Sequence, residues 1–197
     1  MAVSLQKGGR VSLSKEVPGL KNIKVGLGWD INATDTGAAY DLDASVFLVG
    51  VDGKVLSDGH FIFYNNNTSP CGGIVHKGDN RTGAGDGDDE VIEINLDKVD
   101  ASIDRIIFTV TIDEARAKNQ NFGQVSNSLI RILNQDGGAV ITQYELDEDY
   151  SSETAINFGE LYRKDGSWNF KAVGAGFNDG LEGFCKMYGV NISWQLV

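Results

Sequence analysis

The fold class is decided by residues 154–173, which read TAINFGELYRKDGSWNFKAV. Two runs with the period-two pattern of strands, Thr154–Tyr162 and Ser167–Val173, stand on either side of Asp165-Gly166. An Asp-Gly pair supplies the residues that a tight hairpin turn needs at positive φ. The stretch therefore predicts an antiparallel β-hairpin.

The same combination recurs along the chain, because Asp52-Gly53 and Asp136-Gly137 also lie between such runs. Many strand patterns with few helical ones favour antiparallel sheets over βαβ units. We therefore expect an all-β fold, a two-sheet antiparallel β-sandwich, with residues 1–197 forming a single domain. The other predicted strands are Val25–Trp29, Ala44–Val49, His60–Phe63, Val91–Leu96, Arg105–Ile112, Ser128–Asn134 and Val140–Tyr144, with Ser193–Val197 as a candidate last strand.

Two short helices are predicted beside the strands. One is Asp113–Lys118, with Asp113 as its N-cap. The other is Asn178–Tyr188, which starts near Asp179 and stops at Gly189. Residues 174–180, GAGFNDG, are superficially similar to a dinucleotide-binding loop, but the third glycine is one residue late and no βαβ unit surrounds it. We interpret this segment as a turn into the second helix.

Composition limits the possible partners. The net charge of −11 argues against nucleic acid and against anionic membranes, since both attract Lys and Arg. Residues Met1–Arg10 lack the apolar run that a signal peptide contains. No stretch of the sequence approaches the roughly 18 consecutive apolar residues of a membrane span. We expect a cytoplasmic protein, not inserted in a membrane, whose Cys71 and Cys185 stay reduced.

A second informative stretch is residues 78–90, GDNRTGAGDGDDE. Carboxylates crowded in this way repel one another, so the loop needs a counter-ion. Ligands that are all oxygen suit calcium better than magnesium, which prefers a strict octahedron and more water. Zinc is disfavoured because the loop has no cysteine and only His76 is near. The spacing does not fit an EF-hand, because counting from Asp86 puts Val91 at position six and Asp97 at position twelve.

A smaller acidic cluster lies at the start of the strand that follows Tyr40. Asp41, Asp43 and Ser45 would share one face, with the alternating Leu42, Ala44 and Val46 turned to the core. The Asn65–Thr68 run could add amide oxygens. If the carboxylates of both acidic stretches converge, seven negative charges meet, and one divalent ion would leave five unbalanced where two would leave three. We therefore expect two ions.

Several of these motifs resemble the TerD family of bacterial tellurium-resistance and stress-response proteins. The central match is residues 78–83 with 85–90, and further matches are residues 25–29, 41–45, 63–66 and 158–163. The resemblance runs over essentially the whole chain. It implies a cytoplasmic β-sandwich that binds calcium, usually two ions, and acts in responses to tellurite, phage or colicins. It also implies partners among the other proteins of the tellurite-resistance system, with a membrane-embedded one as a possible member.

Carried over by motif, the resemblance implies a set of metal ligands in the two acidic stretches. Thr82 and Gly83 would contribute backbone oxygens. The full set is Asp41, Asp43, Asp79, Asn80, Thr82, Gly83, Asp86, Asp88, Asp89 and Glu90.

We expect no enzyme. The sequence has no G-x-S-x-G elbow, P-loop or H-E-x-x-H motif, and His60 and His76 are isolated from one another. Direct reduction of tellurite would need paired thiols or a cofactor, whereas Cys185 is predicted to lie in the core. The leading hypothesis is a calcium-dependent scaffold or sensor for protein partners. The alternatives are a calcium-dependent lectin or adhesion-type sandwich and a metal-dependent hydrolase.

Overall fold

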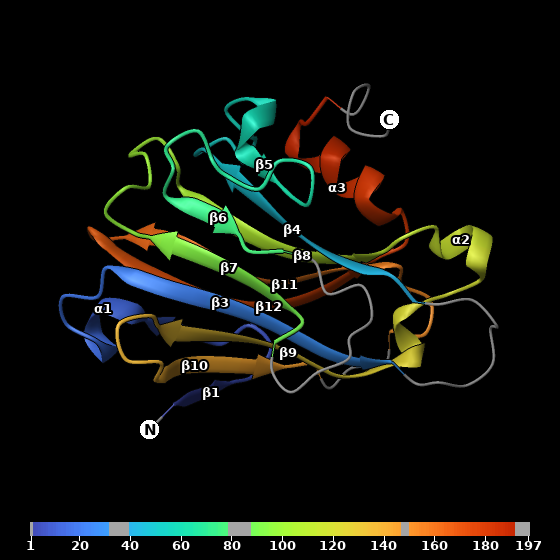
Figure 1. The fold of residues 1–197 in the computed structure, drawn as a ribbon, viewed down its shortest axis with the longest axis horizontal. Helices are drawn as coiled ribbons and strands as arrows, with labels where there is room; N and C mark the ends of the chain where they lie inside the picture. The colour runs from blue at the N-terminus through green and yellow to red at the C-terminus, as the bar shows by residue number, and fades with distance from the viewer. Residues whose placement is uncertain (1, 32–39, 79–87, 147–149, 192–197) are drawn as a thin grey trace.

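A computed structural model describes residues 2–31, 40–78, 88–146 and 150–191, and the candidate strand Ser193–Val197 lies outside them. Two sheets pack face to face (Figure 1). The first runs in the order β1 (Val3–Leu5), β10 (Val140–Glu145), β9 (Val125–Asn134), β3 (Asn22–Ile31), β7 (Glu90–Asn95), β6 (Ile74–His76). The second runs β2 (Arg10–Ser12), β12 (Ser167–Phe177), β11 (Ala155–Lys164), β8 (Arg105–Ile112), β4 (Leu42–Val49), β5 (Phe61–Ile62).

Neighbouring strands are antiparallel except for β1 and β10, which are parallel. This confirms the predicted two-sheet antiparallel sandwich. β11 and β12 form the expected hairpin, with Asp165 at φ 50° and Gly166 at φ 74°. The β9–β10 hairpin also forms, but its left-handed residue is Gly138 rather than Asp136 or Gly137.

Three strands that we did not predict are β1, β2 and β6, each only three residues long. Such short segments contain too few residues to display a period-two pattern. Most of the other predicted strands have bounds that differ from the observed ones by one to four residues, and two of these differences change the interpretation of a segment. His60 lies in the 3₁₀ turn η1 (Asp58–His60), and β12 continues to Phe177, so residues 174–177 are strand rather than turn.

The helices are short. α1 (Leu13–Glu16) was not predicted, and a second 3₁₀ turn is η2 (Phe122–Gln124). α2 (Ala115–Lys118) has Glu114 at its N-cap in place of the predicted Asp113. α3 (Gly180–Tyr188) follows Asp179 and ends at Gly189 in the left-handed conformation, as predicted. No helix of the described chain is long and apolar enough to cross a membrane.

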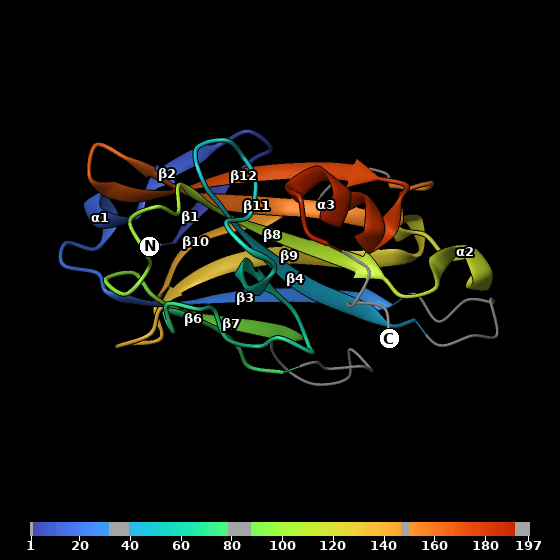
Figure 2. The same ribbon diagram turned by 90° about the horizontal axis from the view of Figure 1, so that it is seen from above.

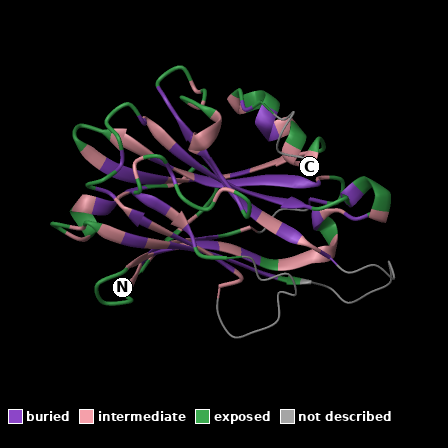
Figure 3. Ribbon diagram, turned by 45° about the horizontal axis from the view of Figure 1, so that its top comes forward, coloured by how far each residue is buried: buried purple, intermediate pink, exposed green. Residues whose placement is uncertain are grey.

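The interior has two parts. The main core lies between the sheets and includes Leu27 and Ile130 of the first sheet and Phe108 and Phe158 of the second. A smaller core lies between the outer face of the second sheet and α3 (Figure 2) and contains Phe47, Phe61, Val49, Phe184 and Cys185. Buried residues run along the middle of the strands, and exposed ones gather at the turns (Figure 3). Burial of Cys185 confirms its predicted place in the core.

Candidate metal site

Eight of the described acidic residues lie where β3 finishes and β4 and β7 begin, a region on one side of the ribbon in Figure 1. Leu27 pairs with Glu90 near the end of β3, and Leu42 pairs with Ile112 at the start of β4. Both sheets therefore send carboxylates toward the same end of the sandwich. We call this region the acidic end; its described carboxylates belong to Asp30, Asp41, Asp43, Asp88, Asp89, Glu90, Asp113 and Glu114.

Asp88 lies against the outer face of the first sheet. Val25 and Leu27 point into the main core, so Gly26 between them faces outward. A Cβ atom on Gly26 would lie 2.0 Å from Oδ2 of Asp88, so only glycine leaves room for this carboxylate. Arg131, the residue opposite Gly26 on β9, donates from Nε to Oδ1 of Asp88 at 2.7 Å. A glycine and an arginine thus hold Asp88 in place.

Asp89 is held by the backbone of β3. Its Oδ2 accepts a hydrogen bond from the N–H of Trp29 at 2.8 Å, and its own N–H donates to the carbonyl oxygen of Leu27 at 2.8 Å. Desolvation raises the pKa of the Asp89 carboxyl, and the nearby charges of Asp30 and Asp88 raise it further against the lowering effect of the Trp29 hydrogen bond. Negative charge is therefore crowded at this point.

Glu90 points the other way, into the interior. It shares the core face of β7 with Ile92 and Ile94. Its Oε2 lies 3.2 Å from Nε2 of His76, and both side chains are almost wholly buried. The N–H of Gly78 donates to Nδ1 of His76 at 3.3 Å, which assigns the neutral-ring proton to Nε2, the atom facing Glu90.

The predicted alternation along β4 is confirmed. Leu42, Ala44 and Val46 belong to the main core, and Asp43 lies on the opposite face, with Thr111 as its partner on β8. That opposite face is not open to solvent along its length, because α3 covers its continuation and Ser45 is buried. Asp41 precedes the strand, and its carbonyl oxygen accepts a hydrogen bond from the N–H of Asp113 at 2.8 Å.

Only part of the predicted ligand set can be placed. Asp41, Asp43, Asp88, Asp89 and Glu90 belong to the described chain, and there they do not form one cluster: among the residues described, no three His, Cys, Asp or Glu side chains are close enough together to hold a metal ion. The predicted ligands outside the described residues are Asp79, Asn80, Thr82, Gly83 and Asp86.

The donors that can be placed do suit a hard divalent cation. They are carboxylate oxygens delivered from both sheets to one end, which is the chemistry that calcium prefers. Built-in cations offset part of the charge: Arg131 pairs with Asp88, and Lys118 lies 3.4 Å from both Asp113 and Glu114. Three of the eight described carboxylates of the acidic end, those of Asp88, Asp113 and Glu114, therefore pair with these two basic side chains.

Sequence reasoning missed four residues of this region. Asp30 accepts a hydrogen bond from the amide of Asn127 at 2.7 Å, and Asp113 turned out to belong to the loop beside Asp41 rather than to a helix cap. Gly26 and Arg131 orient Asp88 from 62 and 43 positions away in the chain. A local sequence pattern does not predict contacts between segments that are so far apart in the chain.

Comparisons with known proteins agree on one family. The model of the TerD domain matches residues 1–188. The tellurium resistance protein TerD of Serratia marcescens is 56% identical over 193 residues, which cover 98% of this chain and all of the relative. General stress protein 16U of Bacillus subtilis is 50% identical over 192 residues, again covering 98% of this chain and all of the relative.

Solved structures lead to the same group. A homologue of the telluride resistance protein TerD from Streptomyces coelicolor superimposes with a TM-score of 0.67 at 26% identity, covering 84% of this chain and 95% of that one. A protein of unknown function, SAV2460, gives a TM-score of 0.70 at 26% identity over 88% of this chain and 99% of its own.

Proposed function

The chain belongs to the TerD family of tellurium-resistance and stress proteins, and from this premise we propose that it is a calcium-binding, non-enzymatic member that acts as a calcium-dependent scaffold or sensor for protein partners. The observation that carries the proposal is the convergence of carboxylates from β3, β4, β7 and the segment after β8 on one end of the sandwich. Such a concentration of like charge favours binding of a divalent cation.

The chain's own residues prepare that end for the ion. Gly26 leaves the space that Asp88 fills, and Arg131 fixes the direction of its carboxylate. The N–H of Trp29 fixes Asp89 in the same way. We propose as ligands, for two calcium ions, the set Asp41, Asp43, Asp79, Asn80, Thr82, Gly83, Asp86, Asp88, Asp89 and Glu90.

Bound calcium would neutralise these carboxylates and so change the charge of the surface that a partner meets. The proposed partners are other proteins of the tellurite-resistance system, in the cytoplasm. Nucleic acid is not proposed, because a net charge of −11 repels a phosphate backbone.

Calorimetric titration of chelator-stripped protein with calcium tests the binding. We expect about two equivalents with micromolar or tighter affinity, because cytosolic sensor sites work in that range. Asp86→Asn combined with Asp88→Asn should abolish at least one equivalent. Asp136→Asn, an exposed aspartate of the β9–β10 turn, is the matched control and should bind as the parent does. Absence of binding, or an equal preference for magnesium, would contradict the proposal.

A separate experiment tests the scaffold role. Purified protein on a solid support is exposed to the co-expressed products of a tellurite-resistance gene cluster, once with calcium and once with chelator. We expect at least one of these proteins to be retained with calcium and lost with chelator. Capture that chelator leaves unchanged would separate calcium binding from partner binding and remove the sensor role.

A further inference from the structure

Three polar side chains lie in the small core between the second sheet and α3. Ser45 on β4 and Asn157 on β11 flank Thr109 on β8, because Thr109 is the register partner of both. Phe47 is two positions from Ser45 on the same strand and packs in the small core with Phe184 of α3, so this face of the sheet meets the helix. All three polar residues are buried. We call them the polar row.

The hydrogen bonds of the polar row are incomplete. The hydroxyl of Thr109 donates to the carbonyl oxygen of Ser45 at 3.2 Å, and a side-chain hydrogen bond joins Asn157 to Tyr188 of α3. The side-chain oxygens of Ser45 and Asn157 are buried and find no hydrogen-bond partner in the part of the chain that the structure describes. A buried oxygen without a partner costs free energy that is regained when water reaches it. The two oxygens therefore oppose the closed position of α3.

The helix that covers the polar row has little stability of its own. α3 has nine residues, and its interior contains Gly183, which lowers helix stability. Isolated helices shorter than about 12 residues are marginal in water. The buried residues of this helix are Phe184 and Cys185. α3 therefore depends on the packing of these two side chains against the sheet.

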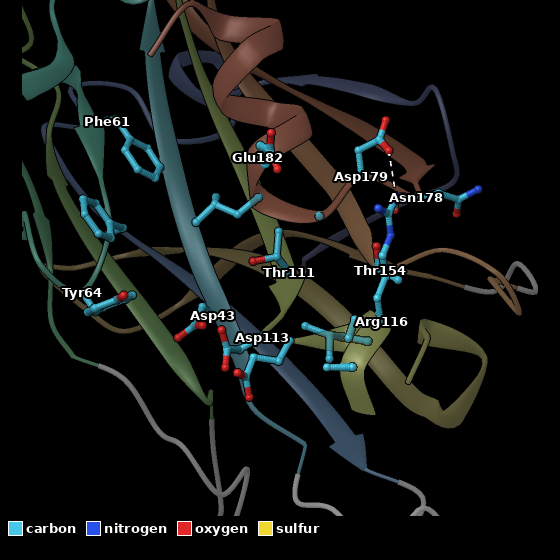
Figure 4. A pocket seen from close by; sticks show the side chains of 17 residues that line it. Asp43, Phe61, Tyr64, Thr111, Asp113, Arg116, Thr154, Asn178, Asp179 and Glu182 are labelled. Carbon is cyan, nitrogen blue, oxygen red and sulfur yellow. Dashed lines mark hydrogen bonds and ion pairs between the residues drawn. The ribbon is translucent and has the colours of Figure 1, made fainter. Parts of the chain in front are cut away.

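The start of α3 has a fixed support. Arg116 of α2 donates from Nη2 to Oδ1 of Asp179 at 3.1 Å and to the carbonyl oxygen of Asn178 at 3.2 Å, beside a pocket of about 410 Å³ (Figure 4). Gly180 follows at φ 57°, in the left-handed region that glycine adopts without strain. The chain therefore has a flexible residue directly after a segment that Arg116 holds.

The other end of α3 is held by the loop that follows β4. The N–H of Val55 donates to the carbonyl oxygen of Tyr188 at 2.9 Å, and Nζ of Lys54 donates to that of Met187 at 2.6 Å. A lysine at this place is favourable because it meets the negative end of the helix dipole. The Lys54 contact is exposed, so water competes for both of its partners.

We propose that α3 is a hinged lid, which turns about Gly180, releases its C-terminal end from Lys54 and uncovers the outer face of the second sheet. In the open position water reaches the two oxygens of the polar row, which offsets part of the packing that is lost. Phe47, which contacts the rings of Phe184 and Tyr188 in the closed position, becomes exposed. The lid thus controls access to an apolar surface. None of these residues is a proposed calcium ligand, so the lid is independent of the calcium site.

The thiol of Cys185 reports the opening, because it is buried while α3 is closed. The background is Cys71→Ser, which leaves Cys185 as the one thiol of the chain. Its reaction with iodoacetamide at pH 8 is followed by mass spectrometry at several urea concentrations below the unfolding transition. We expect a rate that urea changes little and that exceeds, at least about tenfold, the rate which global unfolding permits. A rate that follows global unfolding at every urea concentration would overturn the lid.

Two variants in this background test the hinge. Lys54→Ala removes a contact that opening breaks and should raise the rate about threefold. Arg116→Ala is the matched control, another basic side chain bonded to a carbonyl oxygen, and it should leave the rate unchanged because its contacts precede Gly180. Equal acceleration in both variants, or none in Lys54→Ala, would overturn the hinge.

Ser45→Ala in the same background tests the polar row. It removes one buried oxygen without a partner, so the closed position should be favoured and the rate should fall about fivefold. Ser4→Ala, at an exposed serine of β1, is the control and should not change the rate. Urea unfolding followed by circular dichroism separates these local effects from changes of overall stability. A rate in Ser45→Ala equal to that of the background would overturn the role of the polar row in opening.

Discussion

The two ends of the second sheet differ in the charged groups that they carry and in the partners of those groups. At the end where β8 begins, Arg163 donates from Nε to the carbonyl oxygen of Ile103 at 3.0 Å and from Nη2 to those of Val99 and Asp100 at 2.9 and 3.0 Å. Its guanidinium also lies 4.4 Å from the centre of the Trp168 ring. At the acidic end, where β8 finishes, eight described carboxylates lie together, and Arg131 pairs with Asp88 while Lys118 pairs with Asp113 and Glu114.

The difference is that the chain itself supplies the partners of Arg163, whereas we propose that a cation from solution binds the acidic end. Arg163 donates hydrogen bonds to the carbonyl oxygens of Ile103, Val99 and Asp100, so these three groups find a partner within the chain. At the acidic end most of the described charged groups are carboxylates, and negative charge attracts cations from solution. The cation at the Arg163 end can therefore be removed only by a substitution. The cation that we propose at the acidic end should be removable by a change of buffer.

Removal of calcium should have the largest effect. If a site has micromolar affinity, one millimolar calcium exceeds its Kd about 1,000-fold and raises the free energy of unfolding by about 4 kcal/mol. Urea unfolding followed by circular dichroism, with calcium and with chelator, measures the difference. The Asp86→Asn/Asp88→Asn variant should lose most of it. Identical midpoints in the two buffers would mean that the acidic end does not depend on calcium.

Arg163→Ala should destabilise the end of the second sheet where β8 begins. Loss of three charge-assisted hydrogen bonds and of the contact with Trp168 should lower the free energy of unfolding by about 3 kcal/mol. Arg163→Lys should lose about half as much, because lysine keeps the charge but not the planar fork. Urea unfolding gives both values.

Lys164→Ala, at the exposed neighbouring position, is the control for Arg163 and should change stability by less than about 0.5 kcal/mol. Calcium affinity should be the same in Arg163→Ala as in the parent. A parallel loss of calcium binding would show that the two ends are coupled.

Gly26→Ala should loosen the acidic end from within the sheet. The added methyl group would meet the Asp88 carboxylate, so the pair with Arg131 must move, at a cost of about 2 kcal/mol. Calcium affinity should fall as well, because Asp88 loses its orientation. Gly137→Ala has open space around its Cβ position and should be nearly neutral. Equal stability of the two variants in urea would show that Asp88 needs no such space.

The smallest effect is expected for the two thiols, Cys71 and Cys185, which should differ in their rate of alkylation. Burial raises the pKa of Cys185 to about 11, so this thiol remains protonated and unreactive near neutral pH. Desolvation also raises the pKa of Cys71, but hydrogen bonds with Ser69 and with the backbone of Gly73 and Asp100 outweigh it and bring the pKa below its usual value. Mass spectrometry after iodoacetamide treatment at pH 8 should find Cys71 alkylated first and Cys185 at least about a hundredfold more slowly.

The sign of the pH effect follows from the raised pKa of Cys185. A folded-state pKa above the unfolded value of about 8.5 favours the neutral thiol, so its contribution to stability is complete below pH 8.5 and is lost as the pH rises toward 11. Alkylation of both thiols at one rate in folded protein would contradict the packing of α3 on the second sheet. Cys71→Ser should remove the fast reaction only.

The sequence predicted the long strands well. β8 has the bounds that were expected, and the β11–β12 hairpin turns at Asp165 and Gly166, because the signals for both lie within a few adjacent residues. The three-residue strands β1, β2 and β6 could not be found, since their pairing depends on neighbours far along the chain rather than on their own pattern.

The candidate site was predictable only in part. The alternation of Asp43 with Leu42 and Ala44 followed from the period of a strand. The opposite directions of Asp88 and Glu90 did not follow, because Asp88 precedes the regular strand and is oriented by Gly26 and Arg131 of other strands. The other five predicted ligands lie outside the described residues: Asp79, Asn80, Thr82, Gly83 and Asp86.

The class of fold, the main strands and turns and the excess of acidic groups could be predicted from the sequence alone, because each depends on composition or on residues adjacent in the chain. The contacts between distant residues became visible only in the folded chain. In the folded chain α3 covers the outer face of the second sheet, and aromatic rings and carboxylates line one pocket. Arg163 there finds the carbonyl oxygens to which it donates hydrogen bonds. The physical reason is that a period-two pattern reports which side chains turn to the same face, but what covers that face is settled by packing between distant segments.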